Sequence, residues 1–600
     1  MTRIRDTSIV SILLVALLVA STGRAWAASG RIIGKVVEAG TGAPLSGVSI
    51  TATGPMHAQT VTSGAGTFSL NNLIPGSYIL ITTFEGYGTS QTNGIMVGEG
   101  MEQSVTITLT RQSDTATLSL GSSNSVPPPL FTYAGDLRAY YFGRTNGNTC
   151  LTCKVNKGTP NALAFNFGGE LHGQLNVPHT PWSVAATYFG AFPFGANWPG
   201  PLNNIGYNPQ VDNTLPGYTL NLFGESYVQY KTPGVLFQTG HEIIYTPWAN
   251  GGDSRMLPES FQGTLISGNV TPNLNLGAMS MARFRTRVIS AFNSNTLLTS
   301  CNTANPTGKG PVEGVSGTFT VPGDPCNKQQ TTYGFSEFSA SYKFGSSGLV
   351  ANVNQYQVYD ISSMTWVTAQ YNFMKQSKFN PYVAGQFLAE NNFGTSVIGT
   401  VHSYTSGGQF GMIIYPNLLF TVGYDGSPST AYVVPAKECK GTASSPAAAS
   451  PGVIFGGVAS TTNKTLPKGE VTCYGGGLAS PYTDNQATDP LYTTSLTQGM
   501  ADVHKPGTSE KVTLGWQSND KRLKALVSDA WYNYSLPGNV AGVGNGDSRA
   551  EFNIDIQYFF NPVRPGPYKG LSIRQRYGDR TQFFTPYDFK YSRTQLEYTF

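Results

Sequence analysis

Charged residues are scarce in this 600-residue chain. Only 12% of its residues are Asp, Glu, Lys or Arg, about half the 25% that a typical soluble globular chain carries. The balance is even, with 37 Lys and Arg against 33 Asp and Glu and a formal net charge of +4. This excludes the strongly basic surface that a nucleic-acid partner requires. A water-exposed globular surface this poor in charge is unusual.

Long apolar runs are scarce too. One lies near the start, where a positively charged segment precedes an apolar run from Ile9 to Ala20, and Ala25-Trp26-Ala27 follows. This order predicts a secretory signal peptide over residues 1–27, cut after Ala27. A membrane anchor is the alternative, but the run is shorter than the roughly 18 apolar residues of a spanning helix. No later stretch approaches that length, which leaves a soluble protein or a β-barrel.

Histidine and cysteine are also few. The six histidines form no motif with Ser, Cys or Asp, so we expect no enzyme, no metal site and no cofactor. The six cysteines form three local pairs in loop-like stretches, and an even count behind a signal peptide predicts disulfides. The pairs are Cys150 with Cys153, Cys301 with Cys326, and Cys439 with Cys473. The first pair is also a CxxC motif, but no second CxxC completes a zinc site.

Short strand-like segments separated by turns recur from residue 30 to residue 111, a spacing typical of a small β-sandwich. Four stretches resemble the carboxypeptidase regulatory-like domain: Gly34–Val37, Gly42–Val48, Gly66–Leu70 and Leu73–Tyr78. The resemblance implies that residues 28–111 are a non-catalytic scaffold or contact domain, of a kind often found ahead of bacterial outer-membrane barrels. Residues 112–130, which include Pro127 to Pro129, are predicted to be a linker.

Glycine and aromatic residues are abundant, with 70 Gly, 32 Tyr and 32 Phe. From residue 131 onward, apolar and polar residues alternate along strand-like segments, which indicates one face in hydrocarbon and one in water. Phe552, Ile554, Ile556 and Tyr558 alternate with Glu551, Asn553, Asp555 and Gln557; Leu596, Tyr598 and Phe600 alternate with Gln595, Glu597 and Thr599. Another segment places Leu220, Leu222 and Val228 on one face, between Tyr218 and Tyr230. A soluble β-sandwich also alternates, but it rarely has so many strands without a domain boundary.

The fold class predicted for residues 131–600 is therefore all-β, a closed antiparallel transmembrane barrel. At about 9 to 11 residues per spanning strand, eighteen strands use under half of this region, and the rest makes long loops and short turns. Alternation marks about 17 to 19 candidate strands, and the even-number rule of single-chain bacterial barrels selects eighteen. The barrel must close, because an unpaired edge in lipid leaves backbone groups without partners.

Three stretches of the barrel region resemble the OprD family of substrate-specific porins: Leu137–Phe142, Ser254–Gly263 and Lys569–Tyr577. The resemblance implies a channel whose arginine ladder passes small solutes that bear a carboxylate. The chain departs from the family in longer cysteine-bearing loops near residues 301–326 and 430–480 and in the extra N-terminal domain. These departures put the substrate preference in doubt more than the fold.

Arginines fall on the faces that such a pore would use. Arg283, Arg285 and Arg287 alternate with apolar residues, as do Arg574 and Arg576, and Arg138 and Arg144 share a face of the first strand. A lipid-facing Arg at the bilayer midplane costs about 2 to 4 kcal/mol, so we expect these side chains in the lumen. Arg255 joins them through the resemblance, and guanidinium groups bind carboxylates in bidentate fashion. Pairing with lumen acids is the alternative role for each of them.

The predicted function is passive, partly selective diffusion of small solutes through the outer membrane of a Gram-negative bacterium, with the N-terminal domain in the periplasm. A TonB-dependent transporter, with a plug inside a 22-stranded barrel, and a structural adhesin barrel are the alternatives. The predicted partners are outer-membrane lipid, small solutes and, for the sandwich domain, a periplasmic component. Relatives act as monomers or loose trimers, and the sequence leaves that choice open.

Overall fold

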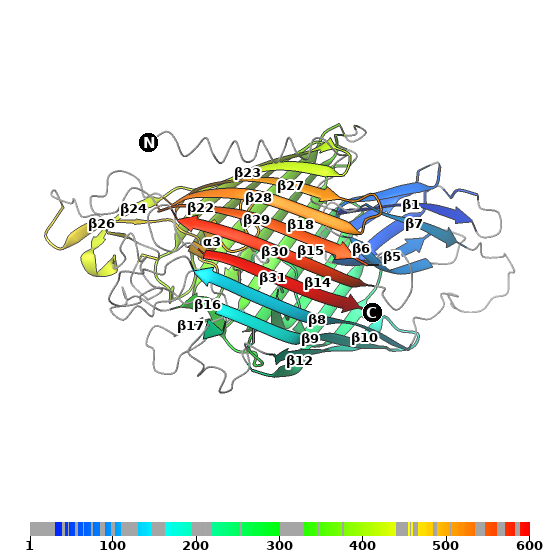
Figure 1. Ribbon diagram of the computed structural model, residues 1–600, viewed down its shortest axis with the longest axis horizontal. Coiled ribbons are helices and arrows are strands. Elements are labelled where there is room, and N and C mark those ends of the chain that lie inside the picture. Colours follow the sequence, from blue (N-terminus) through cyan, green and yellow to red (C-terminus); the bar gives the residue numbers. More distant parts are fainter. Residues whose placement is uncertain are drawn as a thin grey trace.

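The structure is a computed structural model (Figure 1). It describes residues 30–109 and 130–600 with interruptions, of which the longest are 147–161, 195–209, 300–328, 440–453, 535–546 and 561–569. The predicted signal peptide, nearly all of the predicted linker, and Cys150, Cys153, Cys301 and Cys326 lie outside the described residues. Among the described residues, no helix has both the length and the apolar character of a membrane span.

Residues 30–109 form two small sheets that share one apolar core. The first has the order β4 (Thr67–Leu73), β1 (Gly30–Glu38), β7 (Glu102–Leu109), and the second β3 (Ala58–Val61), β2 (Ser49–Thr53), β5 (Gly76–Thr83), β6 (Ser90–Val97). Ile32, Val36, Tyr78 and Leu80 are fully buried in the core between them. The small β domain that the sequence predicts is therefore present.

A third, much larger sheet closes on itself, because the last strand pairs with the first strand after the N-terminal domain: Leu596 lies opposite Ala139. The two-residue β11 (Gln210–Val211) is inserted in this sheet beside β9. The other eighteen strands are antiparallel to their neighbours, which confirms the predicted barrel. They are β8 (Phe131–Asn146), β9 (Ala162–Asn176), β10 (Trp182–Pro193), β12 (Leu220–Lys231), β13 (Val235–Glu242), β14 (Ser260–Thr271), β15 (Leu274–Arg285), β18 (Phe335–Lys343), β19 (Leu349–Val358), β20 (Ser362–Asn372), β21 (Tyr382–Asn392), β22 (His402–Tyr415), β23 (Leu418–Ser427), β27 (Gly507–Gln517), β28 (Leu523–Tyr534), β29 (Asp547–Phe559), β30 (Leu571–Gln582) and β31 (Phe589–Thr599).

The two faces of the barrel wall follow the predicted alternation. On β29, Ile556 is 41% exposed on the outside, whereas Glu551 and Asn553 are buried on the inside. On β31, Leu596 and Phe600 are exposed outside, and Gln595 is buried inside. Exposed apolar side chains on the outside of a barrel suit a hydrocarbon environment, and the polar inner face suits water.

One predicted face is wrong. Leu220 and Leu222 pack in an inner cluster with Phe189, whereas Val228 is exposed on the outside. The cause is a β-bulge between β12 and β10, at Gly224, which shifts the alternation by one residue. A side chain at Gly224 has no room, because a Cβ there lies 2.0 Å from the ring of Phe189.

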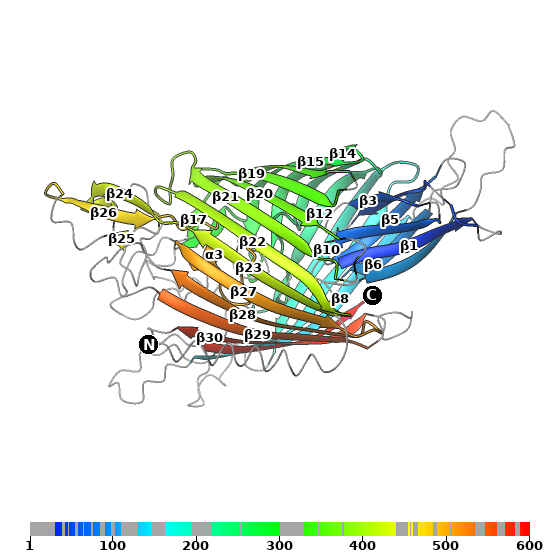
Figure 2. The ribbon, with the colours of Figure 1, turned by 90° about the horizontal axis from the view of Figure 1, so that it is seen from above.

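The two ends of the barrel differ in the length of their connections. Residues 232–234, 272–273 and 416–417 are complete connections at one end, and residues 286–334 and 428–506 are connections at the other. The N-terminal domain and the C terminus both lie at the end with short connections (Figure 2). There, the Lys521 ammonium donates a hydrogen bond to the backbone carbonyl of Glu102. Burial lowers the pKa of Lys521.

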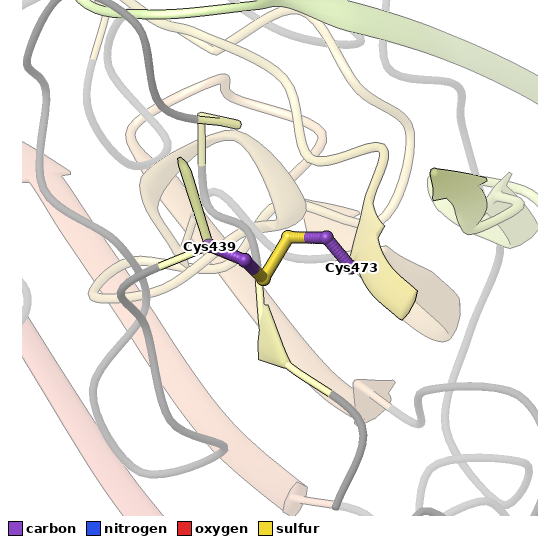
Figure 3. The surroundings of a disulfide bond; sticks show 2 residues. All are labelled: Cys439 and Cys473. Carbon is purple, nitrogen blue, oxygen red and sulfur yellow. A yellow bond between two sulfur atoms is a disulfide. The ribbon is translucent and has the colours of Figure 1, made fainter. Parts of the chain in front are cut away.

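A small accessory sheet extends from the end with long connections, with the order β24 (Thr430–Pro435), β26 (Glu470–Gly475), β25 (Val458–Ala459) (Figures 1 and 2). A disulfide joins Cys439 to Cys473 beside it (Figure 3). The predicted pairing of these two cysteines is confirmed. The short helix α3 (Met500–Val503) follows in the same connection and leads into β27.

Candidate functional site in the barrel lumen

The basic side of the lumen is built on the last strands of the barrel. On β30, Arg574, Arg576 and Arg580 alternate with outward residues such as Ile573, which is 40% exposed. Arg576 lies opposite Arg593 of β31, so two guanidinium groups start from the same height of the wall. Because residues two apart on a strand are about 7 Å apart, these side chains form a column along the lumen.

The arginines of this column have a charged partner, neutral partners and one another as neighbours. Nε of Arg574 donates to Oδ1 of Asp555 at 2.8 Å, and the Arg574 side chain stays 32% exposed. Nη2 of Arg576 donates to the amide oxygen of Gln595 at 3.4 Å. The guanidinium of Arg593 stacks 4.6 Å from the ring centre of Tyr591. Arg574 and Arg593 also act on Arg576 by charge repulsion.

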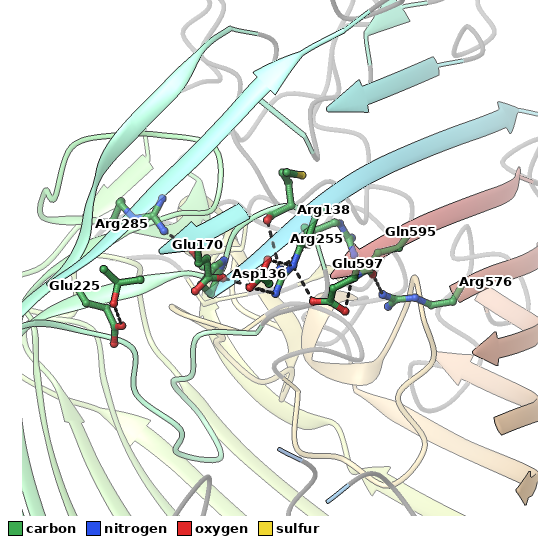
Figure 4. A network of polar contacts seen from close by, with 12 residues as sticks. Asp136, Arg138, Glu170, Glu225, Arg255, Arg285, Arg576, Gln595 and Glu597 are labelled. Carbon is green, nitrogen blue, oxygen red and sulfur yellow. Dashed lines mark hydrogen bonds and ion pairs between the residues drawn. The ribbon is translucent and has the colours of Figure 1, made fainter. Parts of the chain in front are cut away.

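Arg138 lies among three acidic side chains at the foot of this column (Figure 4). Its Nε lies 2.8 Å from Asp136 Oδ1 and 3.0 Å from Glu597 Oε1, and Nη2 lies 3.7 Å from Glu170 Oε1. Its Nη1 also approaches the backbone carbonyl of Arg255 at 3.4 Å. Arg138 therefore faces the lumen as predicted, and its contacts hold the inward-folded connection that carries Arg255.

Arg285 and Arg287 are buried at the start of a long connection. Nη1 of Arg285 donates to the backbone carbonyls of Thr286 at 2.9 Å and Ile289 at 3.0 Å. Nη2 of Arg287 lies 3.0 Å from Oε1 of Glu259, and both side chains are 1% exposed. The alternative that the sequence allowed, pairing with an acidic side chain, describes Arg287, whereas Arg285 binds backbone carbonyls.

Arg283 is on the opposite face from the one predicted. It lies opposite Gln262, which lies opposite His241, and this side of β14 also carries Ile266, which is 48% exposed. The cause is a bulge in β15 at Ala282, which lets Arg283 point outward with Ala282. Strict alternation through residues 283, 285 and 287 therefore does not hold.

Two predicted arginines remain to be placed, and three further arginines on the inner side were not predicted. Arg255 is buried, with its guanidinium 5.8 Å from the ring centre of Phe142. Arg144 lies in β8 opposite Tyr591, and its side chain is outside the described part. Sequence reasoning missed Arg549, Arg580 and Arg593, all buried on the inner side. Alternation along β30 and β31 could have predicted Arg580 and Arg593, because each lies an even number of residues from an inward-facing residue on its strand.

Two connections fold into the lumen and narrow it. The first, residues 243–259, places Trp248 among the inner apolar residues beside β19, where the Tyr356 hydroxyl accepts a hydrogen bond from the Trp248 backbone N–H at 3.2 Å. The second, residues 476–503, places Tyr482 against the rings of Phe261 and Phe335, with ring centres 5.6 and 5.1 Å away. The same segment approaches the basic column, where Nη2 of Arg593 donates to the Leu496 carbonyl at 3.4 Å.

Three inward carboxylates hold the second connection in place. Asp425 Oδ2 accepts hydrogen bonds from the Thr493 backbone N–H at 2.8 Å and hydroxyl at 2.7 Å. Glu551 accepts from the backbone N–H of Thr497 at 3.0 Å and from its hydroxyl. Glu390 Oε2 accepts from the Ala479 backbone N–H at 2.7 Å. The second connection is thus fixed against the inner wall, where its Leu496 carbonyl meets Arg593 of the basic column.

This arrangement can attract and release an anion, since guanidinium groups present several N–H donors along one wall. The described residues hold no group of three or more His, Cys, Asp or Glu arranged to bind a metal ion.

The fold and the site together define a class: a closed transmembrane β-barrel of eighteen strands with a charged, narrowed lumen. The family model of the carboxypeptidase regulatory-like domain matches residues 31–110, which is the N-terminal sandwich. A search of curated proteins finds no match.

Solved structures of porins share the barrel fold. OccAB3 of Acinetobacter baumannii is 15% identical with a TM-score of 0.54, covering 78% of this chain and 99% of its own. The BenF-like porin of Pseudomonas fluorescens Pf-5 is 14% identical with a TM-score of 0.54, covering 78% and 98%. OpdK of Pseudomonas aeruginosa, solved with vanillate, is 13% identical with a TM-score of 0.52, covering 78% and 98%. At these identities the likeness shows the fold.

Proposed function

We propose that this protein is an outer-membrane channel of the OprD type, for passive and partly selective diffusion of small solutes that bear a carboxylate. The long connections face the cell exterior and the N-terminal sandwich lies in the periplasm, because bacterial barrels place short turns on the periplasmic side. The chain needs no energy source for this, since the solute moves down its own gradient.

The observation that carries the proposal is the basic column of Arg574, Arg576, Arg580 and Arg593 beside the narrowed lumen. A carboxylate that leaves Arg574 meets Arg576 about 7 Å further along β30, and Arg580 follows about 14 Å beyond. Conduction requires that each such site binds the solute weakly enough to release it. We assign solute contact to Arg574, whose side chain is 32% exposed, while the buried Arg576, Arg580 and Arg593 add positive charge to the wall around it. Arg138, Arg285 and Arg287 instead hold the inward connections, through the ion pairs and carbonyl contacts described above.

Two further observations support this choice. The structure of OpdK was solved with vanillate, which is an aromatic carboxylate, and the same ligand class suits an arginine-lined passage here. A TonB-dependent transporter requires about 22 strands around a plug, whereas this barrel closes with eighteen. The barrel size therefore favours the channel.

The test is ion and solute selectivity in planar bilayers and liposomes. We expect wild type to give stepwise conductance and to pass benzoate faster than the uncharged benzamide. Replacing Arg574, Arg576 and Arg593 together by Gln should lower the benzoate preference about tenfold, because one charge-assisted hydrogen bond contributes at least about 1.4 kcal/mol. The reversal potential in a salt gradient should shift toward cation selectivity.

Lys590→Gln serves as the matched control. It removes one positive charge from β31, but on the outward side, where Lys590 is 60% exposed and pairs with Asp579 at 3.1 Å. Its selectivity should equal that of wild type. An unchanged benzoate preference in the triple variant refutes the assignment to these arginines, and absence of stepwise conductance in wild type refutes the channel.

A further inference from the structure

A polar patch lies on the outside of the barrel, where lipid is expected. The strand register shows that the patch faces outward, because residues paired on neighbouring strands point to the same side of the sheet. Val228 is exposed on the outside of β12 and pairs with Thr239, and Thr239 pairs with Thr264. We call this surface the outer polar patch. It comprises Ser226, Thr239, His241, Gln262, Thr264, Ser280, Arg283 and Ser336, on β12 to β18.

The patch shortens the apolar belt on this side. On β9 the exposed apolar residues run from Phe167 to Leu175, about 27 Å along the strand at about 3.4 Å per residue. On β14 they run only from Ile266 to Val270, about 14 Å along the strand. Beyond Ile266 the outward positions of β14 are polar, toward the end of the barrel with long connections.

Arg283 is the charged member of the patch. It is exposed, and no hydrogen bond or ion pair joins it to another residue in the part of the chain that the structure describes. The His241 ring lies near it on the same face and stacks on Phe292 at 3.9 Å between ring centres. Tyr333, which is 82% exposed, also lies close to Arg283. Its neighbour Gly334 packs directly against the backbone of Ala282, the residue before Arg283.

Since none of the described side chains neutralises this cation, an anion from outside the chain is a candidate partner. A second copy of the chain is one source, since Glu510 and Asp529 lie on the outward positions of β27 and β28. However, β27 is eight strand steps from β14 around the eighteen-stranded barrel, which is nearly opposite. Contacts between opposite faces build a line of molecules and no closed ring. Contact between the patches of two copies brings the two Arg283 side chains together, and their like charges repel.

We propose that the outer polar patch binds the phosphate-bearing headgroup of a membrane lipid. The Arg283 guanidinium donates to the phosphate, as arginine does in bidentate phosphate pairs. Gln262 and the patch hydroxyls add neutral hydrogen bonds to the headgroup, and Phe292 and Tyr333 supply interfacial aromatic contacts. The site lies toward the long connections, which the proposed orientation places in the outer leaflet.

Native mass spectrometry of the purified full chain in detergent tests this. The probes are lipid A, with phosphate monoesters, phosphatidylglycerol, with a phosphodiester, and diacylglycerol, with no phosphate. We expect wild type to retain one or both of the phosphate-bearing lipids and to retain no diacylglycerol. The relative retention of lipid A and phosphatidylglycerol shows which headgroup binds better. Arg283→Gln should weaken retention about tenfold, as for the loss of one charge-assisted hydrogen bond. Arg283→Lys should keep part of it.

Lys590→Gln, an outward cation outside the patch, should bind lipid like wild type. Retention in Arg283→Gln equal to wild type overturns the proposal, and so does equal retention of diacylglycerol. Disulfide-linked dimers of Arg283→Cys also overturn it, because they place a second copy on the patch. Arg283→Gln should keep the conductance and selectivity of wild type, since Arg283 lies outside the lumen. Lipid retention is measured without conductance, so failure of the proposed channel leaves this result interpretable.

Discussion

At the scale of the residue, the ion pair between Arg287 and Glu259 makes the sharpest stability prediction. It joins the two long connections next to β14 and β15, and both side chains are 1% exposed. Removing one partner of a buried pair costs about 3 to 5 kcal/mol, because the other charge remains buried. We expect Arg287→Met to lower the midpoint of thermal unfolding clearly, as followed by circular dichroism.

The double variant Arg287→Met with Glu259→Gln provides the control for this prediction. Removing both charges avoids the uncompensated carboxylate, so most of the lost stability should return. Equal unfolding midpoints for wild type and the single variant would show that the pair contributes nothing.

The arginines also show how far single residues can be predicted. On β30, strict alternation placed Arg574 and Arg576 inward, and the same rule extended by two or four residues reaches Arg580 on β30 and Arg593 on β31. It failed at Arg283, because the bulge at Ala282 arises from how β15 pairs with β14. Nothing within residues 274–285 marks that extra residue, since an inserted position depends on the partner strand as much as on its own.

At the scale of the element, the inward connection of residues 476–503 depends on few polar contacts. Thr493 binds Asp425 and Thr497 binds Glu551, each through its backbone N–H and its hydroxyl. We expect Asp425→Ala with Glu551→Ala to release the segment, so that single-channel conductance rises and its fluctuations increase. Thr493→Ser keeps the hydroxyl and should conduct like wild type. If the double variant conducts like wild type as well, these carboxylates do not hold the segment.

The accessory sheet gives a second prediction at this scale. The disulfide between Cys439 and Cys473 closes a loop with a sequence separation of 34, which in the chain-entropy description contributes about 3 to 5 kcal/mol. No strand of the barrel takes part in the sheet of β24, β25 and β26. Cys439→Ser with Cys473→Ser should therefore make residues 430–475 sensitive to limited proteolysis while the barrel stays resistant. If the barrel strands of the variant were cleaved as fast as residues 430–475, the disulfide would stabilise more than the accessory sheet, which contradicts the prediction.

The sequence was informative about strands and silent about the inward segments. Two-residue alternation is a local signal, so the strands of the barrel could be predicted from their own residues. The segment 476–503 has no such period, and its place in the lumen is set by partners far along the chain, such as Glu390 and Asp425. The bulge at Gly224 likewise depends on the ring of Phe189 on another strand.

At the scale of the whole molecule, the strand number followed from length and from the need for closure. A sheet in lipid has to pair its last strand with its first, and β31 does so with β8. The uneven belt of apolar residues could not be predicted in the same way. It emerges only when neighbouring strands are placed in register, which brings Thr264, Ser280 and Ser336 into one row.

The N-terminal sandwich and the barrel form separate sheets with separate apolar cores. The hydrogen bond from Lys521 to the Glu102 carbonyl lies between them, and a surface contact of this kind contributes about 1 kcal/mol or less. We therefore expect deletion of residues 28–129 behind the signal peptide to leave a barrel that still closes, inserts and conducts. Heat-modifiable electrophoretic mobility reports closure, and bilayer recordings report conductance. Lys521→Ala in the full chain should give the same conductance as wild type. A deletion variant that fails to insert would mean that the sandwich takes part in barrel assembly, as a guide for the first strand that follows it.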